Sequence, residues 1–236
     1  MERIHGIVLR QIKYSDTRQI IDLFTLEKGR MSLVQKIQKN KSSFLSHLDI
    51  IKFDIDSRPK TTLPLMHNIE KSYPLISLRF DTIKTVLVMF LSEFLSNALR
   101  EESENANLFK YIEYSLCWLD KAEDSYANFH IVLLIHITRF LGIEPNTDDY
   151  SPHKYFDLQN GCYSQSTPTK KDITLSSEES RTLPYLLHMN YENMHLYHLS
   201  RRQRRRCLEV ITTYYQIHIP SFRELNSVSV LKELFD

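Results

Sequence analysis

Short runs rich in Ile, Val, Leu, Phe and Thr fill the first 75 or so residues and predict β-strands. Lys28 and Gly29 separate two of these runs and supply a residue that tolerates a positive φ at a hairpin turn. Five short strands cannot form a wide flat sheet, and closing into a small barrel removes their exposed edges. The predicted strands are residues 4–14, 19–27, 30–37, 47–56 and 63–73.

Beyond these strands the spacing of apolar positions changes to that of an amphipathic α-helix. Nine apolar residues from Ile83 to Leu99 recur at i, i+3, i+4 and i+7. A second helical pattern covers residues 108–119. A third, 126–141, is apolar almost all round and stops at Gly142, a residue suited to a helix C-cap. We expect this third helix to be the buried centre of a bundle.

Polar sequence after the third helix contains one β-hairpin signal, residues 155–163, with its turn at Asn160 and Gly161. Helical pattern resumes behind Ser176 and Ser200, each with the spacing of a capping box. The last helix is predicted to bury a stripe made of Cys207, Val210, Ile211, Tyr214 and His218.

Together these patterns predict an α+β fold with two domains. Residues 1–78 are expected to form the five-stranded barrel, and residues 79–236 a helical domain with a small β-hairpin insertion near 150–170.

Composition is that of a soluble globular protein, with 42% apolar and 25% charged residues. The four glycines lie too far apart for a phosphate-cradling loop, which excludes a P-loop or dinucleotide fingerprint. The three cysteines form no Cys-x-x-Cys pair, and neither a signal peptide nor a run of about 20 apolar residues is visible. We therefore expect a cytoplasmic protein without membrane association.

Charge is unevenly distributed, although the formal net charge is only +1. Residues 1–80 carry 14 basic and 8 acidic side chains, whereas residues 81–198 carry 9 basic and 17 acidic ones. Basic residues in predicted strands and loops can line a groove that follows a phosphate backbone, or can form an ordinary solvated face. The candidate nucleic-acid-binding residues are Arg10, Lys13, Lys28, Arg30, Lys36, Lys39 and Lys41.

A second basic cluster, residues 201–206, occupies the expected first turns of the last helix. Cations there oppose the helix macrodipole, each by roughly 0.3–1 kcal/mol when exposed. Two explanations remain open: the arginines serve a partner, or they pair internally with acidic residues of the segment 101–124.

No catalytic or metal site emerges from the residue types and spacings. There is no Gly-x-Ser-x-Gly sequence, and the pair His195 and His198 lacks carboxylate or thiolate partners at ligand spacing. Cys162 stands alone in the predicted hairpin, where structural zinc needs four ligands. The sequence therefore predicts no enzyme, no catalytic residue, no metal and no cofactor.

The order of motifs resembles the RecO family of bacterial recombination mediators. The opening Gly6-Ile-Val-Leu-Arg, followed by the Phe24-Thr-Leu-Glu-Lys-Gly29 turn, is similar to the start of that family. Phe156-Asp-Leu with Gly161 resembles its central hairpin. At the other end, Tyr214 to Pro220 and the Leu225-Asn-Ser-Val-Ser-Val-Leu231 stretch are similar to its closing helix and tail.

This resemblance implies an N-terminal OB-fold barrel that binds single- and double-stranded DNA, annealing of complementary strands, and loading of RecA with RecR, at the nucleoid. It also implies docking of the acidic tail of single-stranded DNA-binding protein on the helical domain, beside a cation. The candidate partner-binding residues are Arg139, Arg201, Arg202 and Arg205. Many members carry a four-cysteine zinc site near the hairpin, from which this chain departs.

Two other functions are weighed against this one. A helical scaffold or adaptor without DNA binding explains the helices but leaves the basic barrel unexplained. A metal-dependent nuclease needs clustered carboxylates or histidines, which the spacing does not provide. Salt-sensitive DNA binding distinguishes the mediator from the scaffold, and metal-stimulated DNA cleavage would indicate the nuclease.

Overall fold

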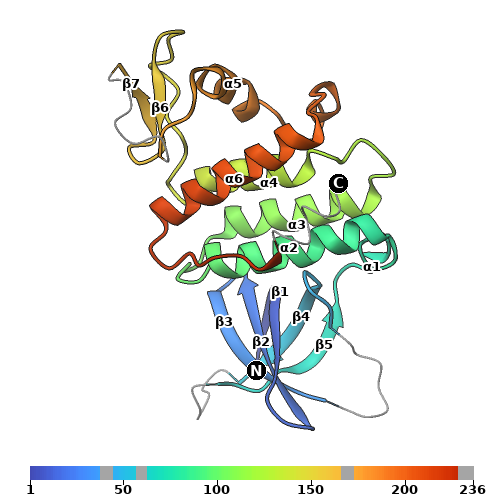
Figure 1. Ribbon diagram of the computed structural model, residues 1–236. Helices are drawn as coiled ribbons and strands as arrows, with labels where there is room; N and C mark the ends of the chain where they lie inside the picture. The colour runs from blue at the N-terminus through green and yellow to red at the C-terminus, as the bar shows by residue number, and fades with distance from the viewer. Residues whose placement is uncertain (38–44, 57–62, 166–172, 228–236) are drawn as a thin grey trace. The chain divides into compact units, whose positions relative to one another are not determined.

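The computed structural model describes residues 1–37, 45–56, 63–165 and 173–227. It divides into two compact units (Figure 1). Unit 1 comprises Met1–Lys121 together with the chain from Arg223 onward, and unit 2 comprises Ala122–Phe222. No helix within these described ranges is both long enough and apolar enough to cross a membrane.

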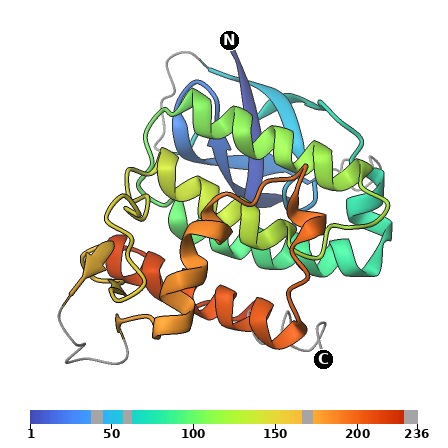
Figure 2. The same ribbon diagram turned by 90° about the horizontal axis from the view of Figure 1, so that it is seen from above.

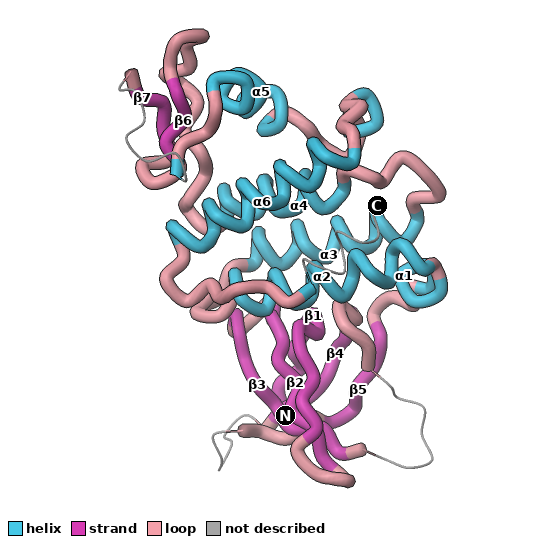
Figure 3. Tube along the Cα trace, viewed as in Figure 1, coloured by secondary structure: helices cyan, strands magenta, loops and turns pink. Residues whose placement is uncertain are grey.

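Unit 1 contains a five-stranded antiparallel sheet with the strand order β3-β2-β1-β4-β5 (Figure 3). Edge strand β3 also forms a parallel bridge, from Val34 to Leu65, with the segment just before β5. In this bridge the amide of Val34 donates to Pro64 O and the amide of Met66 donates to Val34 O, both at 2.9 Å. The sheet is OB-like but is not closed along its whole edge, and the predicted N-terminal fold is confirmed. The strands are β1 (Glu2–Lys13), β2 (Arg18–Thr25), β3 (Gly29–Lys36), β4 (Ile50–Ile55) and β5 (His67–Lys71).

Alternation along the strands separates the barrel core from its outer face. Ile21 and Leu23 of β2 and Leu33 of β3 point inward and are fully buried. The predicted turn is also present: Gly29 has φ 65°, and a Cβ atom there would lie 2.3 Å from the carbonyl carbon of Ser103. Only glycine fits this position, because both the backbone angle and the available space exclude a side chain.

Helices α1 (Ile76–Phe80), α2 (Thr82–Ala98) and α3 (Ala106–Lys121) complete unit 1 and lie at one end of the sheet (Figures 1 and 2). The Asp81 side chain accepts from the amide of Lys84 and caps α2. Ser92 of α2 donates to Leu9 O of β1, so helix and sheet are joined by a buried hydrogen bond.

Unit 2 contains α4 (Phe129–Phe140), α5 (Ser177–Leu187), α6 (Arg201–His218), the short 3-10 helix η2 (Met194–Leu196) and a two-stranded sheet of β6 (Tyr155–Asp157) and β7 (Cys162–Ser164). Both predicted capping boxes are present, at Ser176 with Glu179 and at Ser200 with Gln203. The predicted hairpin and the apolar, buried α4 are confirmed.

Two local expectations for unit 2 were inaccurate. The third helix begins at Phe129 and not at residue 126, because the chain first forms a turn in which the amide of Phe129 donates to Tyr126 O at 2.9 Å. The buried stripe of α6 is wider than predicted, since Leu208 and Tyr215 are buried while His218 is only partly so. α6 packs against α4 on one side and against the hairpin on another, which buries two neighbouring faces.

Candidate nucleic-acid interface and partner pocket

The outer face of strands β1, β2 and β3 carries a row of polar residues. In the strand register Arg10 lies opposite Asp22, and Asp22 lies opposite Ser32, so the three side chains share one face. Asp22 accepts a hydrogen bond from Ser32 at 2.6 Å. Arg10 is exposed and can contact a ligand on this face.

Two further rows continue the same face. Ile12, Ile20 and Val34 form an apolar row that is only partly covered, and Arg18 lies opposite Lys36 at the far end. Tyr14 is opposite Arg18, since its amide donates to Arg18 O at 3.1 Å, and its side chain is 68% exposed. We refer to Arg10, Ile12, Tyr14, Arg18, Ile20, Val34 and Lys36 as the outer face.

Exposed cations beside an aromatic ring and aliphatic side chains suit a single nucleic-acid strand. Guanidinium and ammonium groups bind phosphates, while an exposed tyrosine offers a surface on which a base stacks. In OB-folds the face of strands 2 and 3 is the usual site of oligonucleotide binding.

The seven basic residues predicted from sequence are not all on this face. Arg10 and Lys36 lie on it. Lys13 follows Ile12 directly in β1, so its side chain points to the opposite side of the strand. There it forms an exposed ion pair with Asp16 at 3.1 Å.

The remaining predicted basic residues are placed differently. Lys28 pairs with Glu2 at 2.9 Å beside the hairpin turn. Arg30 is largely buried and pairs with Asp22 at 3.1 Å, so this side chain does not project into solvent. Lys39 and Lys41 lie outside the described residues.

Sequence reasoning missed the uncharged members of the outer face and also Arg18. Ile12 and Tyr14 alternate with Arg10 at the period of a strand, and Arg18 follows the turn behind them. The period-two spacing of a strand indicates that Ile12 and Tyr14 lie on the face of Arg10. A search for clusters of basic residues does not detect these uncharged side chains.

One polar cluster of unit 1 contains residue types used in nucleophilic catalysis. Ser72 Oγ lies 3.2 Å from His5 Nε2, and a Glu113 oxygen lies 3.2 Å from the same nitrogen. A hydrolytic triad needs the serine and the carboxylate on opposite ring nitrogens, so this cluster cannot relay a proton. Burial lowers the pKa of His5, although Glu113 opposes this.

Metal-binding geometry is also missing from the part of the chain that the structure describes, where no three His, Cys, Asp or Glu side chains gather to hold an ion. Cys162 begins β7 and is a free cysteine. The absence of structural zinc stays a prediction.

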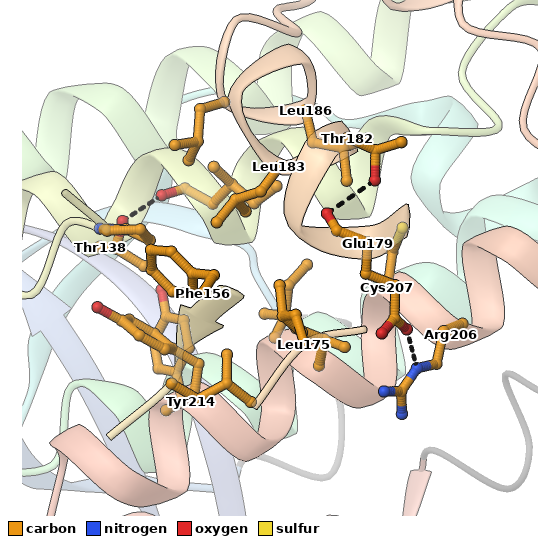
Figure 4. Close-up of a pocket in the computed structure, with 17 residues that line it drawn as sticks. Thr138, Phe156, Leu175, Glu179, Thr182, Leu183, Leu186, Arg206, Cys207 and Tyr214 are labelled. Atoms are coloured by element: carbon orange, nitrogen blue, oxygen red, sulfur yellow. Dashed lines mark hydrogen bonds and ion pairs between the residues drawn. The ribbon is translucent and has the colours of Figure 1, made fainter. Parts of the chain in front are cut away.

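Unit 2 contains an apolar pocket between α4, α5, α6 and the hairpin (Figure 4). Its walls include Phe156, Leu175, Leu183 and Val210. At the edge, Arg206 Nε donates to Glu179 Oε1 at 2.5 Å, and this hydrogen bond raises the pKa of Arg206. The pocket thus combines an apolar interior with a charged rim.

None of the four predicted partner-binding arginines lines this pocket itself. Arg202 is exposed one helical turn before Arg206, on the same side of α6, and forms no ion pair with another described residue. Arg205 is 3.7 Å from Glu209. Arg139 and Arg201 are exposed but do not line the pocket.

Two arginines of this cluster have ion-pair partners within unit 2. Arg206 pairs with Glu179 of α5, and Arg205 with Glu209 of the same helix. The tertiary contact between α5 and α6 provides the carboxylate of Glu179.

Two residues near the C-terminal end of α6 hold the hairpin against this helix. Tyr214 donates its hydroxyl to Ile143 O at 2.9 Å, and His218 Nε2 lies 2.8 Å from Leu158 O. The rings of Tyr214 and His218 are 4.2 Å apart. Tyr214 lines the pocket, so these contacts position one of its walls.

Comparison with known proteins tests the resemblance to the RecO family. The model of the Recombination protein O C terminal matches residues 79–225, and that of the Recombination protein O N terminal matches residues 1–55. The chain belongs to the RecO family. Membership in the RecO family supports a role in DNA repair and recombination.

Full-length relatives agree with this assignment. The chain is 41% identical over 240 residues to the DNA repair protein RecO of Phocaeicola vulgatus, covering 100% of this chain and 99% of the relative. It is 40% identical over 241 residues to the DNA repair protein RecO of Bacteroides fragilis, with both chains covered completely. The DNA repair protein RecO of Flavobacterium psychrophilum is 30% identical over 236 residues, covering 98% of this chain and 97% of the relative.

Proposed function

We propose that this RecO-family chain is a DNA-binding recombination mediator and not an enzyme. It binds single- and double-stranded DNA through the outer face and anneals complementary strands. With RecR it helps to load RecA onto DNA coated by single-stranded DNA-binding protein, in the cytoplasm at the nucleoid.

The outer face is the observation that carries this proposal. Arg10 supplies exposed positive charge at one end and the pair of Arg18 and Lys36 at the other, where Tyr14 lies beside Arg18, and Ile12 lies between the two ends. The five residues from Arg10 to Tyr14 span about 13 Å at the usual rise of a strand. Contacts of this kind neutralise phosphates and stack on bases without reading base edges. A mediator that acts at any damaged site needs such sequence-independent binding.

The pocket of unit 2 supports the partner part of the proposal. An acidic peptide with an apolar end needs an apolar cavity beside a cation, and the pocket rim offers Arg206 with Arg202 one turn away. We assign this pocket to the tail of single-stranded DNA-binding protein.

Fluorescence anisotropy with labelled single strands and duplexes tests the DNA-binding step. The variant Arg10→Glu, Arg18→Glu, Lys36→Glu is compared with wild type between about 50 and 200 mM salt. Each lost phosphate contact is expected to lower the log–log salt slope by about 0.7 for single strands and about 0.9 for duplexes. Affinity should fall alike for different sequences.

Lys110→Glu on α3 provides a matched control, because Lys110 is exposed in the same unit but away from the outer face. The control should bind like wild type. A folded triple variant with unchanged affinity and slope would contradict the proposal. Arg30 is left intact, because reversing its charge would break the buried pair with Asp22 and confuse stability with binding.

A further inference from the structure

A cavity of about 630 Å³ opens in unit 1 where the outer face meets α2. Its lining comes from β1, β2, β3, α2 and the segment 223–226. This size lies within the usual range for small-ligand sites, about 300–1,000 Å³. Four of the lining residues are arginines, Arg10, Arg30, Arg100 and Arg223.

Arg30 lines this cavity and carries a buried donor that is not satisfied. Its side chain is only 15% exposed, and its Nη2 atom is 3.1 Å from Asp22 Oδ2. Its Nη1 atom is buried and has no hydrogen-bond partner among the described residues. Leaving a buried donor without a partner is unfavourable, so an acceptor that reached Nη1 after a small turn of the guanidinium group would be favoured.

Two of the carboxylates in the lining are already engaged. Asp22 accepts from both Arg30 and Ser32. Glu93 accepts from the amides of Asn226 and Ser227, at 2.9 and 2.7 Å, and from the Ser227 hydroxyl. These bonds fix Asp22 and Glu93 in place. The third carboxylate of the lining, Glu224, is exposed.

Positive charges crowd Arg30. Burial lowers the pKa of Arg30, Asp22 opposes this, and the charges of Arg100 and Arg10 lower it further. An anion between these guanidinium groups would relieve their repulsion and accept from their fixed N–H donors.

We infer that this cavity is a phosphate-binding site, and that its occupant is a phosphate group of the DNA strand on the outer face. Arg10 belongs to both the outer face and the cavity lining, so a strand on that face leads directly to the cavity. The inference rests on the proposed function for its source of phosphate. Free phosphate or a free nucleotide offers the same phosphate oxygens, and the test distinguishes these ligands from DNA.

The test uses Arg100→Gln, Arg223→Gln, since both residues are exposed cavity arginines that are not part of the outer face. Lys110→Gln, Lys121→Gln removes the same charge from exposed positions of α3 and serves as the control. Circular dichroism and the melting temperature in chloride establish that both variants fold.

Two measurements are made on full-length protein. In the first, the melting temperature is recorded in potassium phosphate and in potassium chloride at equal ionic strength and pH, without DNA. Phosphate should raise the melting temperature of wild type and control by more than that of the cavity variant, which keeps only the general stabilisation that phosphate gives any folded protein. In the second, the cavity variant should lose about 0.7 from the salt slope of single-strand binding for one lost phosphate contact.

The outcomes separate the hypotheses. Equal stabilisation of wild type and cavity variant by phosphate, or no stabilisation of wild type, overturns the site. Stabilisation that requires the arginines, combined with an unchanged salt slope, overturns DNA as the source and leaves free phosphate or a nucleotide. The proposed function is refuted separately if the variant Arg10→Glu, Arg18→Glu, Lys36→Glu binds DNA like wild type. This outcome does not depend on the result for the cavity variant.

Discussion

A Cβ atom on Gly161 would lie 2.8 Å from the hydroxyl oxygen of Tyr214. Gly161 also has φ 65°, a conformation that side chains disfavour. The hairpin turn therefore approaches α6 so closely that glycine is required for two independent reasons. Because Tyr214 lines the pocket of unit 2, this contact also positions the pocket wall.

Gly161→Ala is expected to destabilise the protein more than Gly142→Ala. Gly142 has φ 70° but no atom within 4 Å of its would-be Cβ, so its substitution adds only backbone strain, about 1 kcal/mol. At Gly161 the displacement of Tyr214 adds to that strain, for a total of at least ~2 kcal/mol. Urea unfolding of both variants checks this, and equal losses would show that the close approach is not rigid.

Tyr14→Ala should weaken single-strand binding by about 1–3 kcal/mol if a base stacks on the ring. Tyr14 is 68% exposed, so the substitution should leave stability almost unchanged. Tyr14→Phe keeps the ring and should bind like wild type in anisotropy titrations. Equal binding by the alanine variant would exclude stacking at this position.

Arg202→Glu is expected to weaken binding of a labelled acidic tail peptide by about tenfold, or ~1.4 kcal/mol. The charge lies one turn from Arg206 at the pocket rim. Arg181→Glu is the matched control, because Arg181 is exposed on α5 and does not line the pocket. Identical peptide affinities of the two variants would remove Arg202 from the site.

Stability should depend on pH through His130 of α4. Burial, with a smaller effect of Arg204, lowers the pKa of His130 to about 3. The unfolded chain, with a histidine pKa near 6.5, binds the proton more readily than the folded chain. As far as this group decides it, the free energy of unfolding is therefore highest above about pH 6.5 and falls as the pH drops towards 3. His130→Leu should flatten this part of the pH profile in urea unfolding. A profile as steep as that of wild type would assign the acid sensitivity to other groups.

The protein is expected to bind no structural zinc. Cys162 is one thiol where a tetrahedral site needs four ligands. Chelator treatment should leave the melting temperature unchanged, and Cys162→Ser should fold normally. Stoichiometric zinc in tag-free protein, lost together with the fold in Cys162→Ser, would refute this.

Local features of the fold were predictable from sequence because each depends on residues close together in the chain. Period-two and period-3.6 patterns located the strands and helices, and the capping boxes at Ser176 and Ser200 were recognised from a spacing of three. Gly29 and Gly161 marked turns that need a positive φ. The start of the third helix was misplaced because nothing in the apolar pattern reveals the turn that precedes Phe129.

The candidate sites depended on contacts between distant residues. Sequence alone determined that basic residues concentrate in the N-terminal strands and at the start of α6, but it could not decide which of them are exposed. Only the tertiary structure buried Arg30 against Asp22, and only it brought Arg100 and Arg223 to the cavity beside Arg10. The physical reason is that burial and charge pairing depend on side chains from several elements, which chain folding brings together and no local pattern encodes.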